Sequence, residues 1–544
     1  MDTICQHKSN LYNYNRRRSK PVRIGKVMIG AKHPIAIQSM TNTDTNDTVG
    51  SAAQVKTIAD AGADIVRLTT QGVREAANLQ NIKREMEAAG CTVPLVADVH
   101  FNPKAAFEAA LHAEKVRINP GNFVDAARTF RKLEFTDEEY NREIDRIRQT
   151  LVPFLELCRE HDTAVRLGVN HGSLSDRIMS RFGDSPAGMV ESVMEFLRIA
   201  REVNFDRIVI SIKASNTVVM VETVRRLVAA MDAEDMHFPL HLGVTEAGDA
   251  EDGRIKSAAG IGALLAEGIG DTIRVSLSEP PENEVPVARM LRDYITARDG
   301  HAWIDEPDMV LPGAARDYAE RYDGTLPEGT NVVAWHADHP ADSSNLIELS
   351  AQGPNPVGAM AAAIDNYVTA GGRQPVLMRL EYACADLDEL RVKSAADFGA
   401  LLLNGYGGGI RVDDPHFDDD TLAQLELDIL QAVRLRTSKT EYISCPGCGR
   451  TLFDLQSTLR QVKEATSHLK GLKIGVMGCI VNGPGEMADA DYGYVGAGPG
   501  RVSIYRGKEC VIKNIPAAEA LPRLLELIGQ ERNRPAYQGR SAYI

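Results

Sequence analysis

Short runs of Val, Ile and Leu recur through the first half of the chain, and stretches with helical spacing of apolar positions lie between them. The helical stretches include 51–61, 186–203 and 217–231. We expect strands at 35–40, 64–69, 94–99, 115–120, 164–169, 207–213, 239–244 and 271–277. Eight strands that alternate with helices over about 250 residues predict an α/β fold with a closed (β/α)8 TIM barrel. An open doubly wound sheet is the alternative, but it usually carries a Gly-rich turn after its first strand, and none follows Met40.

The pattern changes after residue 277. A helix begins near Val285, the segment 300–329 is rich in loop-forming residues, and strand-like runs follow at 332–336, 345–349, 376–382 and 400–403, before a helix at 422–436. The remaining sequence predicts a helix at 451–468, a strand at 472–477, strands near 502–505 and 509–512, and an amphipathic helix at 517–528. We therefore divide the chain into a barrel domain (20–295), an inserted α/β domain of unknown role (296–426) and a C-terminal α/β domain (427–544).

Composition and charge narrow the class of protein. A chain of 544 residues, 44% hydrophobic and 25% charged, is typical of a globular protein with more than one domain. A formal net charge of −14 argues against a general nucleic-acid binder. The sequence contains no apolar run long enough to span a membrane, and none follows the three arginines at 16–18 to make a secretory signal. We interpret that basic segment as an N-terminal arm, in preference to a transit peptide, and predict a cytoplasmic bacterial protein.

Three cysteines are grouped in the C-terminal part of the sequence. Cys445 and Cys448 form a C-x-x-C motif, and Cys479 begins a second Gly-rich loop that also contains Glu486. Three thiolates from two Gly-rich loops can bind one iron–sulfur cluster, because small residues let backbone N–H groups approach the sulfides. The fourth iron then lacks a thiolate, and Glu486 is the nearby acid in the same loop.

A structural zinc site is the alternative interpretation of these cysteines. In that case His468 and Cys510 could complete a tetrahedron of ligands. The eight cysteines do not make a disulfide framework, since five of them are scattered singly, and we expect a reducing compartment.

Four predicted strands place an arginine between apolar neighbours, as in Val66-Arg67-Leu68. Because side chains alternate along a strand, apolar neighbours that face the helices leave each arginine facing the barrel interior. With Lys213, these cations indicate a doubly phosphorylated substrate at the barrel mouth; pairing of each arginine with a structural carboxylate is the alternative. The arginines are Arg67, Arg117, Arg166 and Arg274, and the other polar residues expected at the mouth are Asp98, Asn119, Asn170, His241, Glu246 and Ser276.

These residues lie in motifs that resemble one known family, the (E)-4-hydroxy-3-methylbut-2-enyl diphosphate synthases of the non-mevalonate isoprenoid pathway. The matching motifs cover nearly all of the barrel and the C-terminal part. The most specific are KSAAGIGALLAEGIGDTIRVSLS at 256–278 and GCIVNGPGE at 478–486, and others are PIAIQSMTNTDT, VRINPGN, VRLGVNHGSL, ISIKASN and ISCPGCGR.

The resemblance implies an iron–sulfur oxidoreductase with a [4Fe–4S] cluster held by Cys445, Cys448 and Cys479, and with Glu486 on the fourth iron. The implied substrate is 2-C-methyl-D-erythritol 2,4-cyclodiphosphate, which is opened and dehydroxylated with two electrons from flavodoxin or ferredoxin. The residues implied to hold the diphosphate are Arg67, Arg117, Arg166, Lys213, Arg274 and Ser276, and those implied at the reacting end are Asp98, Asn170, Glu246 and Asn482. A non-catalytic phosphosugar-binding barrel with a zinc-stapled tail is the competing hypothesis.

The chain departs from the shorter members of this family in its inserted segment. Those members run from the eighth strand through one helix into the cluster domain, whereas here a long segment separates Ile295 from Leu427. The chain therefore resembles the three-domain form. The resemblance also implies a homodimer, and in the short forms the cluster domain of one subunit is thought to cap the barrel of its partner.

Overall fold

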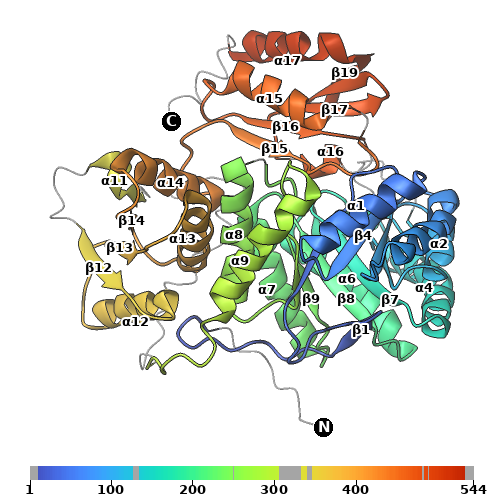
Figure 1. Cartoon of the computed structure of the whole chain (residues 1–544), viewed down its shortest axis with the longest axis horizontal. Coiled ribbons are helices and arrows are strands. Elements are labelled where there is room, and N and C mark those ends of the chain that lie inside the picture. The colour runs from blue at the N-terminus through green and yellow to red at the C-terminus, as the bar shows by residue number, and fades with distance from the viewer. Residues whose placement is uncertain are drawn as a thin grey trace.

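The computed structural model describes residues 10–125, 134–248, 250–305, 332–339, 346–451, 453–480, 483–487 and 489–532. These residues form a closed barrel, a four-stranded sheet and a five-stranded sheet, together with a small two-stranded sheet. Figure 1 shows the four-stranded sheet and its helices beside the barrel, and the five-stranded sheet and its helices above the barrel. We call these two units the insert (333–432) and the cap (441–532).

The barrel is made of eight parallel strands that follow one another in chain order and close between the last and the first. The predicted TIM barrel is thereby confirmed. The eighth strand is shorter than predicted, because only two of its residues pair with the strands on either side. The barrel strands are β3 (Ala36–Met40), β4 (Ile65–Thr70), β5 (Leu95–Val99), β6 (Lys115–Ile118), β7 (Ala164–Asn170), β8 (Ile208–Lys213), β9 (Leu240–Leu242) and β10 (Thr272–Ile273).

Helices surround the barrel, and polar side chains cap several of them where the chain leaves a strand. At the start of α1, Asp47 accepts a hydrogen bond from the backbone N–H of Gly50 at 3.0 Å. Asn216 does the same for Val218 in α7, also at 3.0 Å. The helices are α1 (Thr48–Asp60), α2 (Val73–Ala88), α3 (Pro103–Ala110), α4 (Asp137–Glu160), α5 (Asp176–Phe182), α6 (Pro186–Glu202), α7 (Thr217–Ala233), α8 (Ala250–Ala266) and α9 (Glu284–Thr296), with a 3₁₀ turn η1 (Pro281–Asn283).

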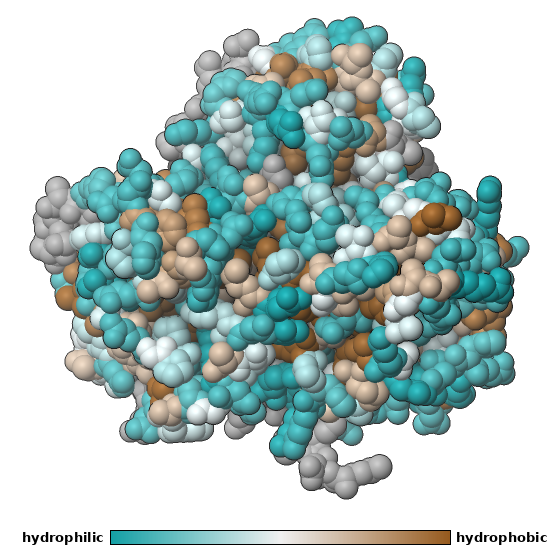
Figure 2. All heavy atoms as spheres, viewed as in Figure 1, coloured by the Kyte–Doolittle hydropathy of each residue, from teal (hydrophilic) through white to brown (hydrophobic). Residues whose placement is uncertain are grey.

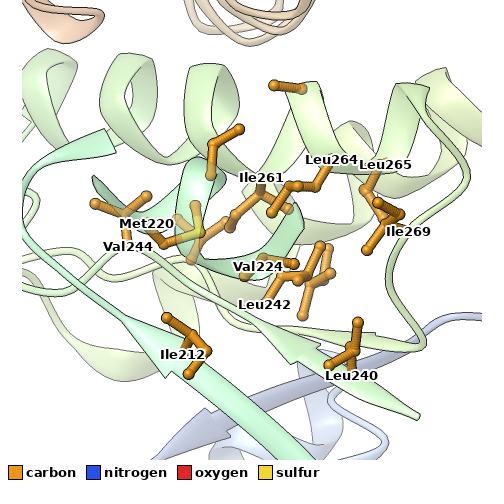
Figure 3. Close-up of a cluster of buried hydrophobic side chains, with 14 of the residues drawn as sticks. Ile212, Met220, Val224, Leu240, Leu242, Val244, Ile261, Leu264, Leu265 and Ile269 are labelled. Atoms are coloured by element: carbon orange, nitrogen blue, oxygen red, sulfur yellow. The ribbon is translucent and has the colours of Figure 1, made fainter. Parts of the chain in front are cut away.

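The two faces of each barrel strand bury different kinds of residue. Outward-facing side chains pack on the helices, and Figure 3 shows Ile212 of β8 and Leu242 of β9 lying opposite Val224 of α7 and Ile261 of α8. Inward-facing side chains at the N-terminal ends of the strands are also apolar. They are covered by the hairpin of β1 (Val22–Ile24) and β2 (Val27–Ile29) in a cluster made of Val22, Ile24, Ile29, Ala36, Ile65, Val96, Ala164 and Val209. The hairpin therefore closes the lower end of the barrel and leaves the C-terminal ends of the strands for ligands.

The insert is a parallel sheet in the order β11-β14-β13-β12, flanked by helices. One strand prediction here was wrong and another was too long. The run 400–403 belongs to the end of α13, and only the first part of 332–336 is a strand, since Trp335 begins a short helix. A short apolar run does not by itself distinguish a buried helix from a buried strand. The elements are β11 (Val333–Ala334), α11 (Trp335–Asp338), β12 (Ile347–Ala351), α12 (Pro356–Thr369), β13 (Val376–Glu381), α13 (Leu387–Leu402), β14 (Gly409–Asp413) and α14 (Asp419–Ala432).

Small residues let the insert pack directly on the barrel. A Cβ atom on Gly262 of α8 would lie 2.7 Å from the Cβ of Ala396 in α13, and one on Gly399 would lie 2.6 Å from the Cα of Ala259. Helix axes can approach this closely only where the side chains between them are small. Helix α8 is therefore buried between the barrel strands and the insert, which explains why its apolar residues are not confined to one face.

The cap is a mixed sheet in the order β15-β16-β17-β18-β19, whose first three strands are parallel and whose last two are antiparallel. Helices α15 and α17 pack on one face, and Met487 after α16 packs on the other. Strands β15 and β17 and helix α16 were not predicted. The elements are β15 (Glu441–Ser444), α15 (Leu455–Thr466), β16 (Lys473–Met477), α16 (Gly483–Glu486), β17 (Tyr492–Gly498), β18 (Arg501–Arg506), β19 (Glu509–Pro516) and α17 (Ala517–Arg532).

The division into three domains stays a prediction. Its second boundary, between residues 426 and 427, falls inside α14, which packs with both α11 and α8. On the face drawn in Figure 2, hydrophobic residues are scattered among hydrophilic ones. None of the helices in the described ranges has both the length and the apolar character needed to cross a membrane.

A buried network of ion pairs joins the cap to the barrel and the insert. Lys256 of α8 reaches Glu441, the first residue of β15, with 2.5 Å between Nζ and Oε1, and Arg434 donates to the other carboxylate oxygen. Lys439 binds Asp252 of α8 at 2.6 Å and Asp428 of α14 at 2.8 Å. The network therefore holds the start of β15, and with it the loop that follows, over the barrel.

We predict that Glu441→Gln destabilises this junction. The substitution leaves Lys256 and Arg434 buried without a compensating charge, which costs about 3–5 kcal/mol when one partner of a buried pair is removed. Thermal unfolding followed by circular dichroism should show a clearly lower midpoint. Glu509→Gln is the matched control, since Glu509 is 67% exposed and, in the part of the chain that the structure describes, pairs with Arg506 alone. Equal midpoints for the two variants would contradict the prediction.

Candidate active site

The barrel interior carries positive charge above its apolar floor. Alternation along the strands turns Arg67, Arg117, Arg166 and Arg274 inward, where between 1% and 6% of each is exposed. Lys213, at the end of β8, is 5% exposed. Their sequence neighbours, such as Val66 and Leu68 beside Arg67, belong to the core between strands and helices. In the structure the four arginines face the barrel interior, as their alternation with apolar neighbours predicts.

The three grouped cysteines come together at one edge of the cap. Strands β15 and β16 are parallel neighbours, so their C-terminal ends lie together and bring the loop of Cys445 and Cys448 next to Cys479. The backbone N–H of Gly478 donates to Sγ of Cys445 at 3.3 Å. Gly447 has φ of +82°, a conformation that few other residues adopt, and it allows the tight turn between the first two cysteines.

One cavity joins the charged barrel interior to the thiols of the cap. It contains about 670 Å³ of space free of atoms. Most of the predicted site residues line it: Arg67, Asp98, Arg117, Asn170, Lys213, Glu246, Arg274, Ser276, Cys445, Cys448, Cys479 and Glu486. Arg166 does not line it and lies buried elsewhere in the barrel interior, while Asn482 is outside the described residues. Neither Asn119 nor His241 is part of the lining.

The cap sits on the barrel of its own chain. Asn170 of β7 donates to Oε1 of Glu486 at 2.6 Å, and the hydroxyl groups of Ser278 and Ser444 lie 2.9 Å apart. At Gly485 the two backbones touch, since a Cβ atom there would lie 2.6 Å from the carbonyl oxygen of Gly172. The cap and the barrel of one chain therefore meet at the cavity.

Some of the buried cations have carboxylate partners. Arg274 binds Glu284 through two hydrogen bonds of 2.9 and 2.8 Å, so the alternative of a structural ion pair holds for this arginine. Arg117 donates to Asp98 at 3.0 Å and to Asn170 at 3.1 Å. These two cations are oriented before any ligand arrives.

Other cations have no such partner. Within the part of the chain that the structure describes, Arg67, Arg166 and Lys213 have no carboxylate oxygen within ion-pair distance. Burial lowers the pKa of Arg67 to about 10 and the pKa of Lys213 well below its ordinary value, because neighbouring cations add to the cost of desolvation. An anion in the cavity would remove that cost, so the charge pattern suits a ligand with several negative charges.

The acidic groups in the cavity differ in protonation. Burial alone would raise the pKa of Asp98, but Arg67 and Arg117 outweigh it and hold that pKa well below the usual range. Burial and the nearby Glu486 raise the pKa of Glu246 well above its ordinary value. Glu246 also has φ of +51°, a strained conformation for a residue with a side chain. The surroundings therefore favour the ionised form of Asp98 and the protonated form of Glu246.

Sequence reasoning missed two lining residues that bind Asp98. His100, two residues further along and hence on the same side of the chain, lies 3.7 Å from Asp98 Oδ1 and accepts a hydrogen bond from Arg117. Burial and the charge of Arg117 lower the pKa of His100 to about 3, so it is neutral. The period-two alternation that was applied to the arginines would have found His100 if it had been applied from Asp98. Arg450 reaches Asp98 from the cap, and no local pattern in the sequence predicts that contact.

The donor set of the cap fits an iron–sulfur cluster better than a single metal ion. Among the described residues, no three His, Cys, Asp or Glu side chains lie close enough together to hold one ion, yet three thiols line one cavity. Thiolates around a cluster stand further apart than those around a single ion, because each binds a different iron. Of the residues needed for the zinc alternative, His468 is exposed and Cys510 lies on β19, away from the cavity lining.

The fold and the site together define a class of protein. Its members have a TIM barrel with a cationic interior, covered by a small α/β cap that carries three thiols. The family model described as GcpE TIM-barrel domain matches residues 19–289, and the one described as GcpE protein C-terminal domain matches residues 441–530. The chain belongs to this family, which confirms the resemblance drawn from the sequence motifs.

The relatives most relevant here carry one name, 4-hydroxy-3-methylbut-2-en-1-yl diphosphate synthase (flavodoxin). The protein from Bacteroides fragilis is 52% identical over 95% of this chain and 96% of its own length. Those from Akkermansia muciniphila and Leptospira interrogans are 42% and 39% identical, again over 95% of this chain and 97% of their own length. Each of these matches therefore spans nearly the whole of both chains.

We predict that Gly485→Ala lifts the cap from the barrel. The added methyl group meets backbone at Gly172, which cannot move aside as a flexible side chain could, and such overpacking costs about 1–3 kcal/mol. Amide hydrogen exchange at residues 170–173 should become roughly tenfold faster or more.

Gly529→Ala is the matched control for this substitution. Gly529 lies in α17, and a Cβ atom there meets nothing within 4 Å. Its exchange at 170–173 should equal that of the unaltered protein. Unchanged exchange in Gly485→Ala would show that the close contact does not hold the cap.

Proposed function

We propose that this chain catalyses the reductive ring opening and dehydroxylation of 2-C-methyl-D-erythritol 2,4-cyclodiphosphate to (E)-4-hydroxy-3-methylbut-2-enyl diphosphate. It is then an iron–sulfur oxidoreductase of non-mevalonate isoprenoid biosynthesis, and its relatives are named as synthases of the same product. One observation carries the proposal: a single cavity joins three thiols and a carboxylate of the cap to buried cations that lack carboxylate partners among the described residues.

Cys445, Cys448 and Cys479 would hold a [4Fe–4S] cluster, and Glu486 would occupy its fourth iron. When bound, such a cluster supplies electrons to the substrate and a Lewis-acidic iron. A carboxylate is a harder and more exchangeable ligand than a thiolate, so Glu486 would be the replaceable ligand among the four. The side-chain amide of Asn170, which donates a hydrogen bond to Glu486, would hold that carboxylate from the barrel side.

The diphosphate would lie at the top of the barrel, where Arg67 and Lys213 lack anionic partners among the described residues. Arg117, Arg274 and Ser276 line the same space. Arg166 lies outside the cavity lining, so it would not touch the diphosphate and would attract it only through its positive charge. The cations stabilise a leaving diphosphate whose negative charge grows as its C–O bond breaks. Asn482 stays a prediction for the reacting end.

Glu246 would supply the proton that the departing hydroxyl group needs in order to leave as water. Its carboxyl group lines the cavity, burial and Glu486 keep it protonated, and its Oε2 has no hydrogen-bond partner among the described residues. Asp98 would stay ionised and orient Arg117 and His100 toward the substrate. The two carboxyl groups therefore take different roles because their surroundings differ.

We take flavodoxin as the electron donor, since the relatives are named for it, with ferredoxin as the alternative. The bacterial cytoplasm suits the chemistry, because it keeps thiols reduced. A homodimer is also part of the proposal, and in it each cap would lie on the barrel of its own chain, through the contact of Glu486 with Asn170.

We predict that protein purified without oxygen is brown and contains about four irons per chain, the content of one [4Fe–4S] cluster. Cys448→Ser should lose most of this iron, whereas Cys510→Ser, outside the cavity, should retain it. Glu486→Gln should keep most of the iron and lose turnover, because the thiolates still hold the cluster. Iron analysis, visible absorption and an assay with the cyclic diphosphate measure these effects. A colourless preparation with one bound zinc would refute the proposal.

We predict that Glu246→Gln lowers turnover by roughly 10²- to 10⁴-fold, the usual contribution of a general acid. The amide has the shape of the protonated carboxyl group, so the dissociation constant of the cyclic diphosphate should change little. Glu251→Gln, in the first turn of α8 and outside the cavity lining, is the control and should turn over normally. A Glu246→Gln variant with normal turnover would mean that another group donates the proton.

A further inference from the structure

One arginine of the cap lies beside the thiols of the proposed cluster site. Arg450 follows Cys448 by two residues in the loop after β15, and it lines the same cavity as Cys448 and Cys479. Its guanidinium group makes a hydrogen bond to the thiol of Cys448 and lies close enough to Cys479 for their charges to interact. Arg450 is only 8% exposed, so water screens these interactions little.

The side chain of Arg450 has donors to spare after its contact with the barrel. Nη2 lies 3.4 Å from Oδ2 of Asp98, and Nη1 is buried without a hydrogen-bond partner among the described residues. A guanidinium group is planar and carries five N–H donors. It can therefore be held by a carboxylate on one side and donate to sulfur on another.

The positive charge of Arg450 is less compensated than that of the other arginine near Cys448. Arg274 also interacts with the charge of Cys448, but it binds Glu284 through two hydrogen bonds of 2.9 and 2.8 Å. Asp98 is shared, because its other oxygen binds Arg117 at 3.0 Å. Arg450 is therefore the stronger source of positive charge at the thiol of Cys448.

Such a charge affects the two oxidation states of an iron–sulfur centre differently. Accepting an electron makes the centre more negative, so a nearby cation or a hydrogen bond to a ligand sulfur stabilises the reduced form more than the oxidised form. We propose that Arg450 raises the reduction potential of the cluster through its charge and its hydrogen bond to Cys448. This inference rests on the proposed function.

Arg450 would thereby favour the entry of electrons. Each reduction transfers one electron from reduced flavodoxin to the cluster, and no bond is formed or broken in that step. A higher potential makes the transfer more favourable. Arg450 acts here through Cys448 and not on the substrate, and Asp98 holds it in place from the barrel side.

Anaerobic redox titration of the cluster-loaded protein without substrate, followed by electron paramagnetic resonance, tests the proposal. In Arg450→Gln the ratio of reduced to oxidised cluster at a fixed potential should fall roughly tenfold, the lower range for a hydrogen bond to a charged group. Tenfold corresponds to a shift of about 59 mV for one electron. Arg450→Lys, which keeps the charge but not the planar fork, should lie between Gln and the natural residue.

Arg460→Gln is the matched control for these variants. Arg460 lies on the exposed side of α15, and its loss should leave the ratio unchanged. A ratio in Arg450→Gln within twofold of the unaltered protein would overturn the proposal.

Iron analysis separates this role from a purely structural one. Arg450→Gln should keep its iron, since the three thiolates and Glu486 remain. Loss of iron from a folded Arg450→Gln would show that Arg450 holds the cluster and does not tune it, which would overturn the proposal. Arg450→Met keeps the apolar stem of the side chain and should match Arg450→Gln in potential. A potential of Arg450→Met equal to that of the unaltered protein would also overturn the proposal.

The outcome for the unaltered protein keeps the two proposals apart. If it holds no iron–sulfur cluster or does not turn over the cyclic diphosphate, the proposed function fails. If it does both and Arg450→Gln has the same potential, only the role of Arg450 fails.

Discussion

Several guanidinium and ammonium groups lie inside the barrel, where the low dielectric makes each of them costly to hold without an anion. The lower end of the barrel avoids this cost, because apolar side chains from the strands pack there against the hairpin of β1 and β2. The upper part of the barrel carries the cost, because Arg67, Arg166 and Lys213 lack carboxylate partners among the described residues. A stable scaffold below and uncompensated charge above together make a binding site for a highly charged ligand.

The cap turns that binding site into a reaction site. Its thiols lie at the ends of parallel strands, and the same sheet edge carries the loop with Arg450 and the turn of α16 with Glu486. Backbone contact between Gly485 and Gly172 allows the cap to approach the barrel without intervening side chains. The cavity is thus bounded by positive charge on the barrel side and by sulfur on the cap side, and an anionic substrate between them meets both.

The insert gives the cap a fixed place on its own chain. Its helix α13 covers α8, and the chain leaves α14 near the ion pairs of Lys439 with Asp252 and Asp428. Glu441 then pairs with Lys256 at the first residue of the cap. A chain without this segment would have to position its cap by other contacts. The architecture here completes the site within one molecule.

The sequence by itself determined the barrel strands and the direction of their side chains. Alternation along each strand placed Arg67, Arg117 and Arg274 inside the barrel, and it would have found His100 from Asp98, because each of these patterns depends only on neighbours along the chain. The strand predicted at 400–403 was wrong, because residues that are buried on all sides do not show the period that distinguishes a helix from a strand. The domain boundaries, the cluster ligands and the substrate contacts stay predictions.

Only the tertiary structure decided which charges meet. It paired Arg274 with Glu284, left Arg166 out of the cavity lining, brought Arg450 to Asp98 and set the cap on its own barrel. These contacts join residues on different elements, many of them hundreds of positions apart. Such contacts depend on the sum of packing over the whole chain, which no local pattern of residues contains.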